Sequence, residues 1–169
     1  MKIVSWNCRG LDSSHKKEDL KKLLHVEKPS ILMLQDTKLG DLETLNDLQK
    51  IWNYCDGHVV SSRGASGGIK IFWKIEDFDL QAQMQTQFWL MVNLLNKVSG
   101  MPFSIINIYM PNNYNEKIEC WQSLLDLGKE NPPQNLIIAG DFNTTRPSKE
   151  KRGGSVVRDQ FREILEDLI

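Results

Sequence analysis

Residues 136–143 read Leu-Ile-Ile-Ala-Gly-Asp-Phe-Asn. The first four residues are apolar, which is typical of a short strand buried on both faces. A carboxylate, Asp141, and an amide, Asn143, follow at the point where that strand ends. In layered α/β folds, the loops that leave strand ends carry the polar groups of functional sites. This stretch therefore predicts a buried strand that leads directly into a site.

Three other strand-like segments also end in polar side chains suited to metal or phosphate chemistry. The strand segments and the side chains at their ends are residues 2–8 with Asn7, residues 31–34 with Gln35 and Asp36, and residues 103–109 with Tyr109 and Asn112. Taken singly, each side chain has an ordinary structural interpretation. Asp141 could form an Asx turn, Asp36 could cap the next segment, and Tyr109 could be a half-buried aromatic residue.

The order of the predicted elements indicates the fold class. Strands are expected over 2–8, 31–34, 58–61, 69–73, 78–84, 88–95, 103–109 and 136–139, and helices over 16–26, 41–52, 116–127 and about 161–168. A turn is expected around Gly64, Gly67 and Gly68, and Pro29 ends the first helix. A run of strands with helices at both ends favours two stacked sheets covered by helices.

Composition bounds the class of protein. The chain has 169 residues, 40% hydrophobic and 25% charged, as expected for one folded domain. Its net charge of −1 excludes gripping nucleic acid by bulk charge alone. A local basic group could still contact phosphate or nucleic acid, although a solvated loop is the simpler interpretation. Its members are Arg146, Lys149, Lys151 and Arg152.

The three cysteines, Cys8, Cys55 and Cys120, have no C-x-x-C spacing, which argues against disulfides and a zinc site. No signal-peptide pattern and no apolar run of membrane-spanning length is present. We therefore expect a nuclear or cytoplasmic protein that is neither secreted nor embedded in a membrane.

Phosphodiester cleavage needs a hard cation, a group that orients water and donors to the phosphate oxygens. Asp36 can hold the cation, Asp141 can orient or deprotonate the water, and Asn7, Asn143 and Tyr109 can donate to phosphate. A generic nucleotide-binding protein has no support, because neither a P-loop nor a G-x-G-x-x-G motif occurs.

Together these motifs resemble those of the endonuclease/exonuclease/phosphatase superfamily, in the right order along the whole chain. The segments that carry the resemblance are Ser5–Leu11, Leu34–Lys38, Ser66–Ile69, Asn107–Asn112, Gly140–Asn143 and Ser148–Ser155. The Cys-Arg-Gly-Leu ending of the first segment and the sequence of the last are most similar to the endonuclease domains of plant LINE-type retrotransposons.

The resemblance implies a four-layer α-β-β-α sandwich with the site at one edge of the paired sheets. It places Asn7 and Asp36 beside Mg²⁺ or Mn²⁺, and Tyr109 and Asn143 against phosphate oxygens. Asp141 would position the attacking water. The implied activity is nicking of DNA, the expected substrate. A phosphatase of the same superfamily and a non-catalytic nucleic-acid-binding remnant are the alternatives.

The sequence departs from the family pattern at two places. Asp36 stands where the family usually has glutamate, and we expect the shorter side chain to weaken metal binding. The family's late Ser-Asp-His segment is missing, since the histidines are His15, His25 and His58. Residues 1–169 are therefore expected to form a single partial domain, incomplete at its C-terminus, with little or no nicking activity.

Overall fold

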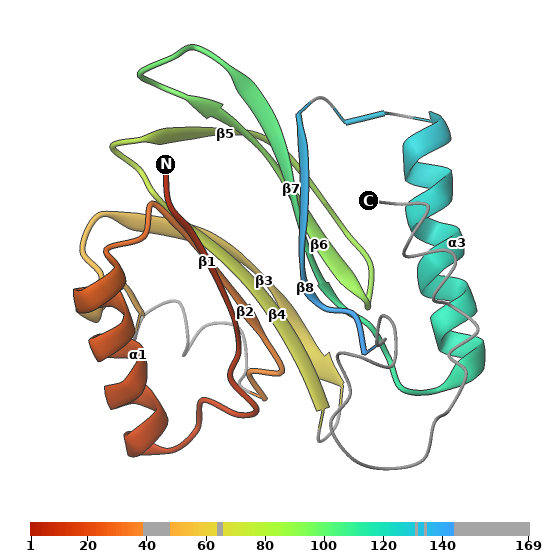
Figure 1. The fold of residues 1–169 in the computed structure, drawn as a ribbon, viewed down its shortest axis with the longest axis horizontal. Helices are drawn as coiled ribbons and strands as arrows, with labels where there is room; N and C mark the ends of the chain where they lie inside the picture. Colours follow the sequence, from red (N-terminus) through yellow and green to blue (C-terminus); the bar gives the residue numbers. More distant parts are fainter. Residues whose placement is uncertain (39–47, 64–65, 131, 134, 144–169) are drawn as a thin grey trace, which may run out of the picture.

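The structure is a computed structural model that describes residues 1–38, 48–63, 66–130, 132–133 and 135–143 (Figure 1). Its strands are β1 (Ile3–Asn7), β2 (Ile31–Gln35), β3 (Cys55–Arg63), β4 (Ser66–Lys74), β5 (Phe78–Gln85), β6 (Trp89–Asn96), β7 (Pro102–Tyr109) and β8 (Leu136–Asp141). Two long helices, α1 (Ser14–Glu27) and α3 (Tyr114–Glu130), connect parallel strands. Among the described residues, no helix is long and apolar enough to cross a membrane.

The strands form two four-stranded mixed sheets. In sheet A the order is β1-β2-β4-β3, and in sheet B it is β5-β6-β7-β8. Within these sheets β1 runs parallel to β2, and β7 runs parallel to β8, whereas the other neighbours are antiparallel. Each parallel pair needs a crossover, which α1 supplies in sheet A and α3 in sheet B.

The sheets stack face to face, with one helix on each outer side (Figure 1). Three buried clusters fill the spaces between the layers. The middle cluster joins the sheets through side chains such as Met33, Ile71 and Ile105. One outer cluster packs α1 on sheet A and includes Leu20, while the other packs α3 on sheet B and includes Trp121. The four-layer α-β-β-α sandwich is confirmed.

Local signals in the sequence explain where α1 begins and ends. The hydroxyl of Ser13 accepts a hydrogen bond from the backbone N–H of Lys16 at 3.3 Å, which caps the first turn. Lys28 adopts a left-handed conformation just after the helix, and Pro29 cannot continue it. The helix predicted over 16–26 is thus confirmed with slightly wider bounds.

The predicted strands are all present, but one turn prediction is wrong in part. Gly67 and Gly68 belong to β4, and their φ angles are +94° and +87°. Gly67 pairs with Ser62 of β3, and the Gly68 oxygen accepts from the N–H of Thr37, which follows β2. A Cβ atom on Gly68 would lie 2.4 Å from the Thr37 hydroxyl, so this strand needs glycine there. Gly64, most of the helix predicted over 41–52 and the helix predicted near 161–168 lie outside the described residues.

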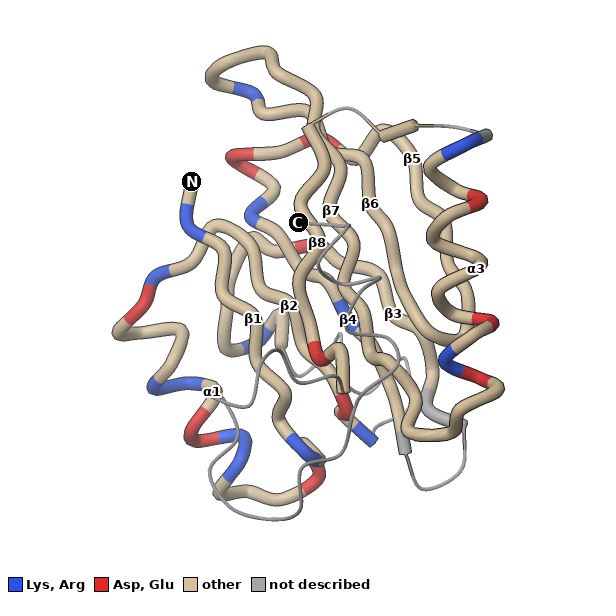
Figure 2. Tube along the Cα trace, turned by 45° about the vertical axis from the view of Figure 1, so that its right-hand side comes forward, with Lys and Arg blue, Asp and Glu red and all other residues tan. Residues whose placement is uncertain are grey.

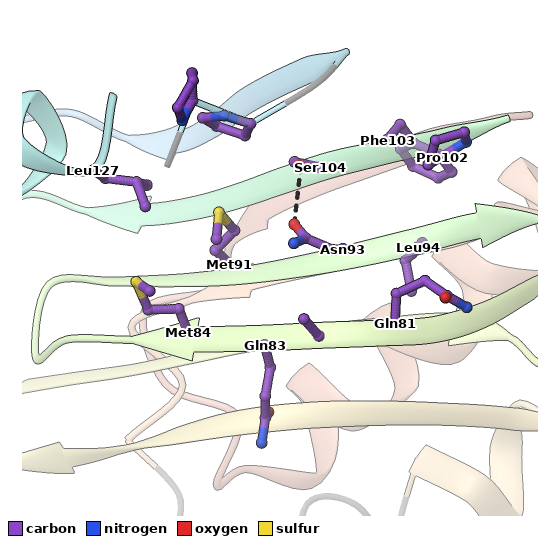
Figure 3. A pocket seen from close by; sticks show the side chains of 13 residues that line it. Gln81, Gln83, Met84, Met91, Asn93, Leu94, Pro102, Phe103, Ser104 and Leu127 are labelled. Carbon is purple, nitrogen blue, oxygen red and sulfur yellow. Dashed lines mark hydrogen bonds between the residues drawn. The ribbon is translucent and has the colours of Figure 1, made fainter. Parts of the chain in front are cut away.

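The outer face of sheet B is hollowed beyond the last turns of α3, as Figure 3 shows. This groove of about 720 Å³ is lined by β5, β6, the beginning of β7, Leu127 and two prolines. Its walls carry apolar and amide side chains without a charged residue. It lies at the end of β7 opposite to Tyr109, so it is separate from the strand ends that carry the predicted site.

Candidate active site

The predicted site lies where β1, the edge of sheet A, meets β8, the edge of sheet B. The side-chain amide of Asn7 donates a hydrogen bond from Nδ2 to Oδ2 of Asp141, across 134 residues of sequence. Parallel pairing aligns Asn7 with Gln35 and Tyr109 with Asp141. Because parallel strands end at the same edge, the structure brings the predicted side chains of both sheets together.

Asp36 is held in one orientation by the backbone around it. It has a φ angle of +52° and is only 8% exposed. Its Oδ1 accepts a hydrogen bond from the Gly67 N–H at 3.1 Å, and its backbone oxygen accepts one from the Gly10 N–H at 2.7 Å. The second carboxylate oxygen, Oδ2, takes part in neither of these bonds and is the candidate oxygen for a ligand.

Tyr109 lies close enough to both carboxylates for their charges to act on its hydroxyl. Burial is the main cause that raises the pKa of its hydroxyl above the ordinary value, and the negative charges of Asp36 and Asp141 raise it further. The positive charge of Arg9 lowers the same pKa. The hydroxyl therefore stays protonated around neutral pH and remains able to donate a hydrogen bond to an anionic ligand.

Removing one of these carboxylates should move the titration of Tyr109. We expect Asp141→Asn to lower the Tyr109 pKa toward the ordinary value, because one negative charge that disfavours the phenolate is gone. Tyrosinate absorbance at about 295 nm is measured against pH in each protein and in the same protein with Tyr109→Phe. The difference between the two curves is the titration of Tyr109, without Tyr54 and Tyr114. An unchanged Tyr109 titration in Asp141→Asn would contradict the proximity of the two side chains.

The loop after β8 is fixed by several short hydrogen bonds. Oδ1 of Asp141 accepts from the backbone N–H of Asn143 at 3.0 Å, so this carboxylate does form an Asx turn. The Asn143 side chain donates from Nδ2 to the Met110 backbone oxygen at 2.5 Å. From α3, the largely buried Lys117 donates from Nζ to the Asn143 backbone oxygen at 2.7 Å. Oδ1 of Asp141 thus forms the turn, whereas Oδ2 accepts the hydrogen bond from Asn7 across the two sheets.

The donor set suits a hard cation. Oδ1 of Asn7 is buried and has no hydrogen-bond partner among the described residues, which is costly for an amide oxygen unless a ligand satisfies it. Together with Oδ2 of Asp36, it offers the oxygen ligands that Mg²⁺ prefers. The described residues hold no cluster of three His, Cys, Asp or Glu side chains, so water would complete the coordination shell.

Several residues that the structure brings to this region were not predicted as site residues. Arg9 supplies a positive charge near Tyr109, and Lys117 braces the Asn143 loop. Lys117 could not be found from motifs, because only the packing of α3 on sheet B places it there.

The predicted basic residues lie outside the described part of the chain; they are Arg146, Lys149, Lys151 and Arg152. In Figure 2, both signs of charge are interspersed along α1 and α3.

Comparison with known proteins agrees with this geometry. Residues 4–158 match the sequence profile described as the Endonuclease/Exonuclease/phosphatase family. The chain belongs to the endonuclease/exonuclease/phosphatase family. Enzymes of this family generally use divalent metal ions, in keeping with the oxygen ligands at the strand ends.

Individual proteins are similar to this chain in sequence or in fold, at low sequence identity. Recombination repair protein 1 of Drosophila melanogaster is 25% identical over 152 residues, which are 86% of this chain and 22% of that protein. The exodeoxyribonuclease of Bacillus subtilis (strain 168) is 26% identical over an alignment of 190 residues, covering 98% of this chain and 69% of the relative. The structure of D. rerio TDP2 with a single-strand DNA product matches 86% of this chain and 61% of its own length, with a TM-score of 0.67 and 20% identity.

Proposed function

We propose that this chain carries the metal and phosphate site of a DNA phosphodiester hydrolase. The observation that supports the proposal is the convergence of Asp36, Asp141 and Tyr109 from two sheets, beside the unpartnered amide oxygen of Asn7. Structural roles explain the single hydrogen bonds, but they do not explain a buried amide oxygen left without a partner next to an acidic pair. A hydrolase site explains all of these features.

In this proposal, Asp36 and Asn7 hold Mg²⁺ or Mn²⁺ through oxygen atoms. The bound cation would neutralise charge on the phosphate. The Tyr109 hydroxyl donates to a non-bridging oxygen, and Arg9 adds a positive charge nearby. Oδ2 of Asp141 orients or deprotonates the attacking water, while Oδ1 remains in the Asx turn. Asn143 offers its second Nδ2 hydrogen to the phosphate, since the first is bound to Met110.

DNA is the proposed substrate. Two of the relatives are named as a recombination repair protein and an exodeoxyribonuclease, and D. rerio TDP2 was solved with a DNA product. The motif endings in residues 8–11 and 148–155 further suggest a plant LINE-type retrotransposon origin. The basic residues between 146 and 152 would contact the DNA backbone, and a nuclear or cytoplasmic location belongs to the same proposal. A phosphatase that acts on small phosphoesters would use the same chemistry.

We further propose that residues 1–169 form one partial domain that cleaves DNA slowly or not at all when tested alone. This sequence has no histidine after His58 to act on the scissile phosphate beside Tyr109. The chain also spans 61% of D. rerio TDP2 and 22% of the Drosophila relative. Metal binding and phosphate binding should survive in residues 1–169, because their ligands lie at the ends of strands that the chain contains.

Titration with Mn²⁺, monitored by calorimetry, tests the proposed site. We expect saturable binding at one site that Asp36→Asn abolishes, with Asp56→Asn, a change of an exposed aspartate on β3, as the matched control. Nicking of a supercoiled plasmid with Mg²⁺ should be weak or absent. Strong nicking that Asp141→Asn removes would overturn the proposed impairment, whereas absence of Asp36-dependent metal binding would overturn the hydrolase site itself. DNA binding without metal dependence would favour the non-catalytic remnant.

Lengthening Asp36 should strengthen metal binding. The backbone fixes this residue through Gly67 and Gly10, so its carboxylate reaches less far than glutamate would. We expect Asp36→Glu to raise Mg²⁺ affinity by about tenfold, because a small misplacement of a ligand is costly at such sites. Competition of Mg²⁺ against bound Mn²⁺ measures the change, and equal affinities in the two proteins would refute the idea.

A further inference from the structure

A pair of buried amides lies directly beneath the candidate site. Gln35, the last residue of β2, is 1% exposed, and Asn107, two residues before Tyr109 on β7, is 0% exposed. They belong to different sheets and are 72 residues apart in sequence. Nε2 of Gln35 donates to Oδ1 of Asn107 at 2.6 Å. This is a direct side-chain link between sheet A and sheet B.

The pair is bonded to further strands on both sides. Nε2 of Gln35 also donates to the Ser5 hydroxyl on β1 at 3.0 Å. Nδ2 of Asn107 donates to the backbone oxygens of Leu34 on β2 and Lys70 on β4, at 3.0 and 2.9 Å. Both hydrogens of each amide group are therefore used, and one network connects three strands of sheet A to β7 of sheet B.

The space between the sheets is thus arranged in three successive levels along the strands. At the first level, the middle cluster of apolar side chains, including Met33 and Ile105, fills the space. Next come Gln35 and Asn107. Beyond them, at the strand ends, lie the proposed metal ligands of sheet A and the proposed phosphate and water groups of sheet B. The amide network is therefore a directed contact between the sheets immediately before the site.

Apolar packing alone fixes the relative position of two sheets less well than hydrogen bonds do. Hydrophobic contact is non-directional, so one sheet can slide by a fraction of an ångström at little cost. A fully bonded buried polar network permits only one alignment. The site is assembled across the two sheets, and a shift between them would separate Asn7 and Asp36 from Tyr109 and Asp141.

We propose that Gln35 and Asn107 are positioning residues, which hold sheet A and sheet B in the register that aligns the two halves of the site. This inference rests on the proposed function for what the site does. The alignment of the two sheets by the amide pair does not depend on that function. Neither residue is a proposed ligand of the metal or phosphate. Both act through side chains that follow them in the chain, Asp36 after β2 and Tyr109 on β7.

The test separates positioning from stability. Replacing both partners by apolar residues of similar size, Gln35→Met with Asn107→Leu, leaves neither amide unpaired. It also takes the donors from the backbone oxygens of Leu34 and Lys70, so the melting temperature should fall by about 10 °C. Affinity for Mn²⁺ should nevertheless fall by about 10–100-fold, as for other changes behind metal ligands. The side-chain amide signals of Asn7 in the NMR spectrum of the metal-free protein should also move, because the bond to Asp141 spans the two sheets.

Two further variants complete the design. Exchanging the residues, Gln35→Asn with Asn107→Gln, restores an amide pair and should recover much of the lost Mn²⁺ affinity. If the apolar double variant does not fold, the exchanged pair still tests the positioning role. Asn93→Leu with Ser104→Ala removes another hydrogen-bonded pair, at 2.9 Å on the outer face of sheet B, and should leave metal affinity and the Asn7 signals unchanged.

Each outcome is decisive for one of the two ideas. Unchanged Mn²⁺ affinity and unchanged Asn7 signals in the folded apolar double variant would overturn the positioning role. If the unaltered protein binds no Mn²⁺, the proposed function fails, and the Asn7 signals of the double variant still decide whether the amide pair aligns the sheets.

Discussion

Replacing Gly140 by alanine should destabilise the protein by about 3 kcal/mol or more, a loss of roughly 10 °C in melting temperature for a domain of this size. A Cβ atom at this position would lie 2.0 Å from the backbone oxygen of Ile108. Backbone atoms in a paired strand cannot move aside as a side chain could. The φ angle of +140° is also one that alanine rarely adopts.

The consequence reaches the site because Gly140 pairs with Ile108, directly before the Tyr109–Asp141 pair. If the variant folds, β8 must move away from β7, and the bond between Asn7 and Asp141 should weaken. Thermal unfolding followed by circular dichroism measures the stability. Gly128→Ala is the matched control, since a Cβ on this exposed glycine of α3 meets no atom within 4 Å. The control should gain about 0.5–1 kcal/mol from better helix propensity.

A Gly140→Ala variant that unfolds within 2 °C of the natural protein would show that β7 and β8 are spaced differently from the structure. That result would also remove the reason for a glycine before Asp141. The sequence motif would then need a functional explanation, such as close approach of a ligand to the backbone.

The sequence predicted the elements well because their signals are local. The strand over 31–34 is a continuous apolar run, and every residue of β2 is buried. The sequence shows both the serine that caps the first helix and the proline that ends it. By contrast, β3 extends from Cys55 to Arg63, well beyond the predicted residues 58–61. Pairing with β4 stabilises those extra residues, and no periodicity within them reveals it.

The site could be predicted only as a list of strand-end residues. The sequence does not reveal which edge of sheet A lies beside which edge of sheet B. The bond between Asn7 and Asp141 depends on that arrangement, because it needs β1 to lie near β8. The same limit hid the roles of Asn107 and Lys117. Asn107 looks like a polar residue in a largely apolar strand, and its partners come from two strands of the other sheet. The left-handed backbone of Asp36 likewise follows from tertiary contacts, because aspartate has only a mild preference for it.

Truncating Trp121 should cost about 3–5 kcal/mol, the usual loss for a buried tryptophan changed to alanine. This residue of α3 is 2% exposed and packs in the outer cluster against sheet B. Its ring stacks on Phe142, with the centroids 6.2 Å apart and the planes at 24°. Phe142 stands between Asp141 and Asn143, so Trp121 supports the loop that carries both of these proposed site residues.

The phenylalanine variant makes the comparison specific. Nε1 of Trp121 is buried and finds no acceptor within the described residues, which costs free energy in the natural protein. Trp121→Phe removes that donor and keeps an aromatic ring over Phe142, so we expect a loss of only about 1–2 kcal/mol. Chemical denaturation gives both values. Equal losses in the two variants would mean that the indole nitrogen has a partner and that stacking on Phe142 contributes little. If Trp121→Ala costs more stability than Trp121→Phe, as expected, ring packing from α3 is what mainly holds Phe142. The stability of the loop that carries Asp141 then depends on the packing of α3 against sheet B.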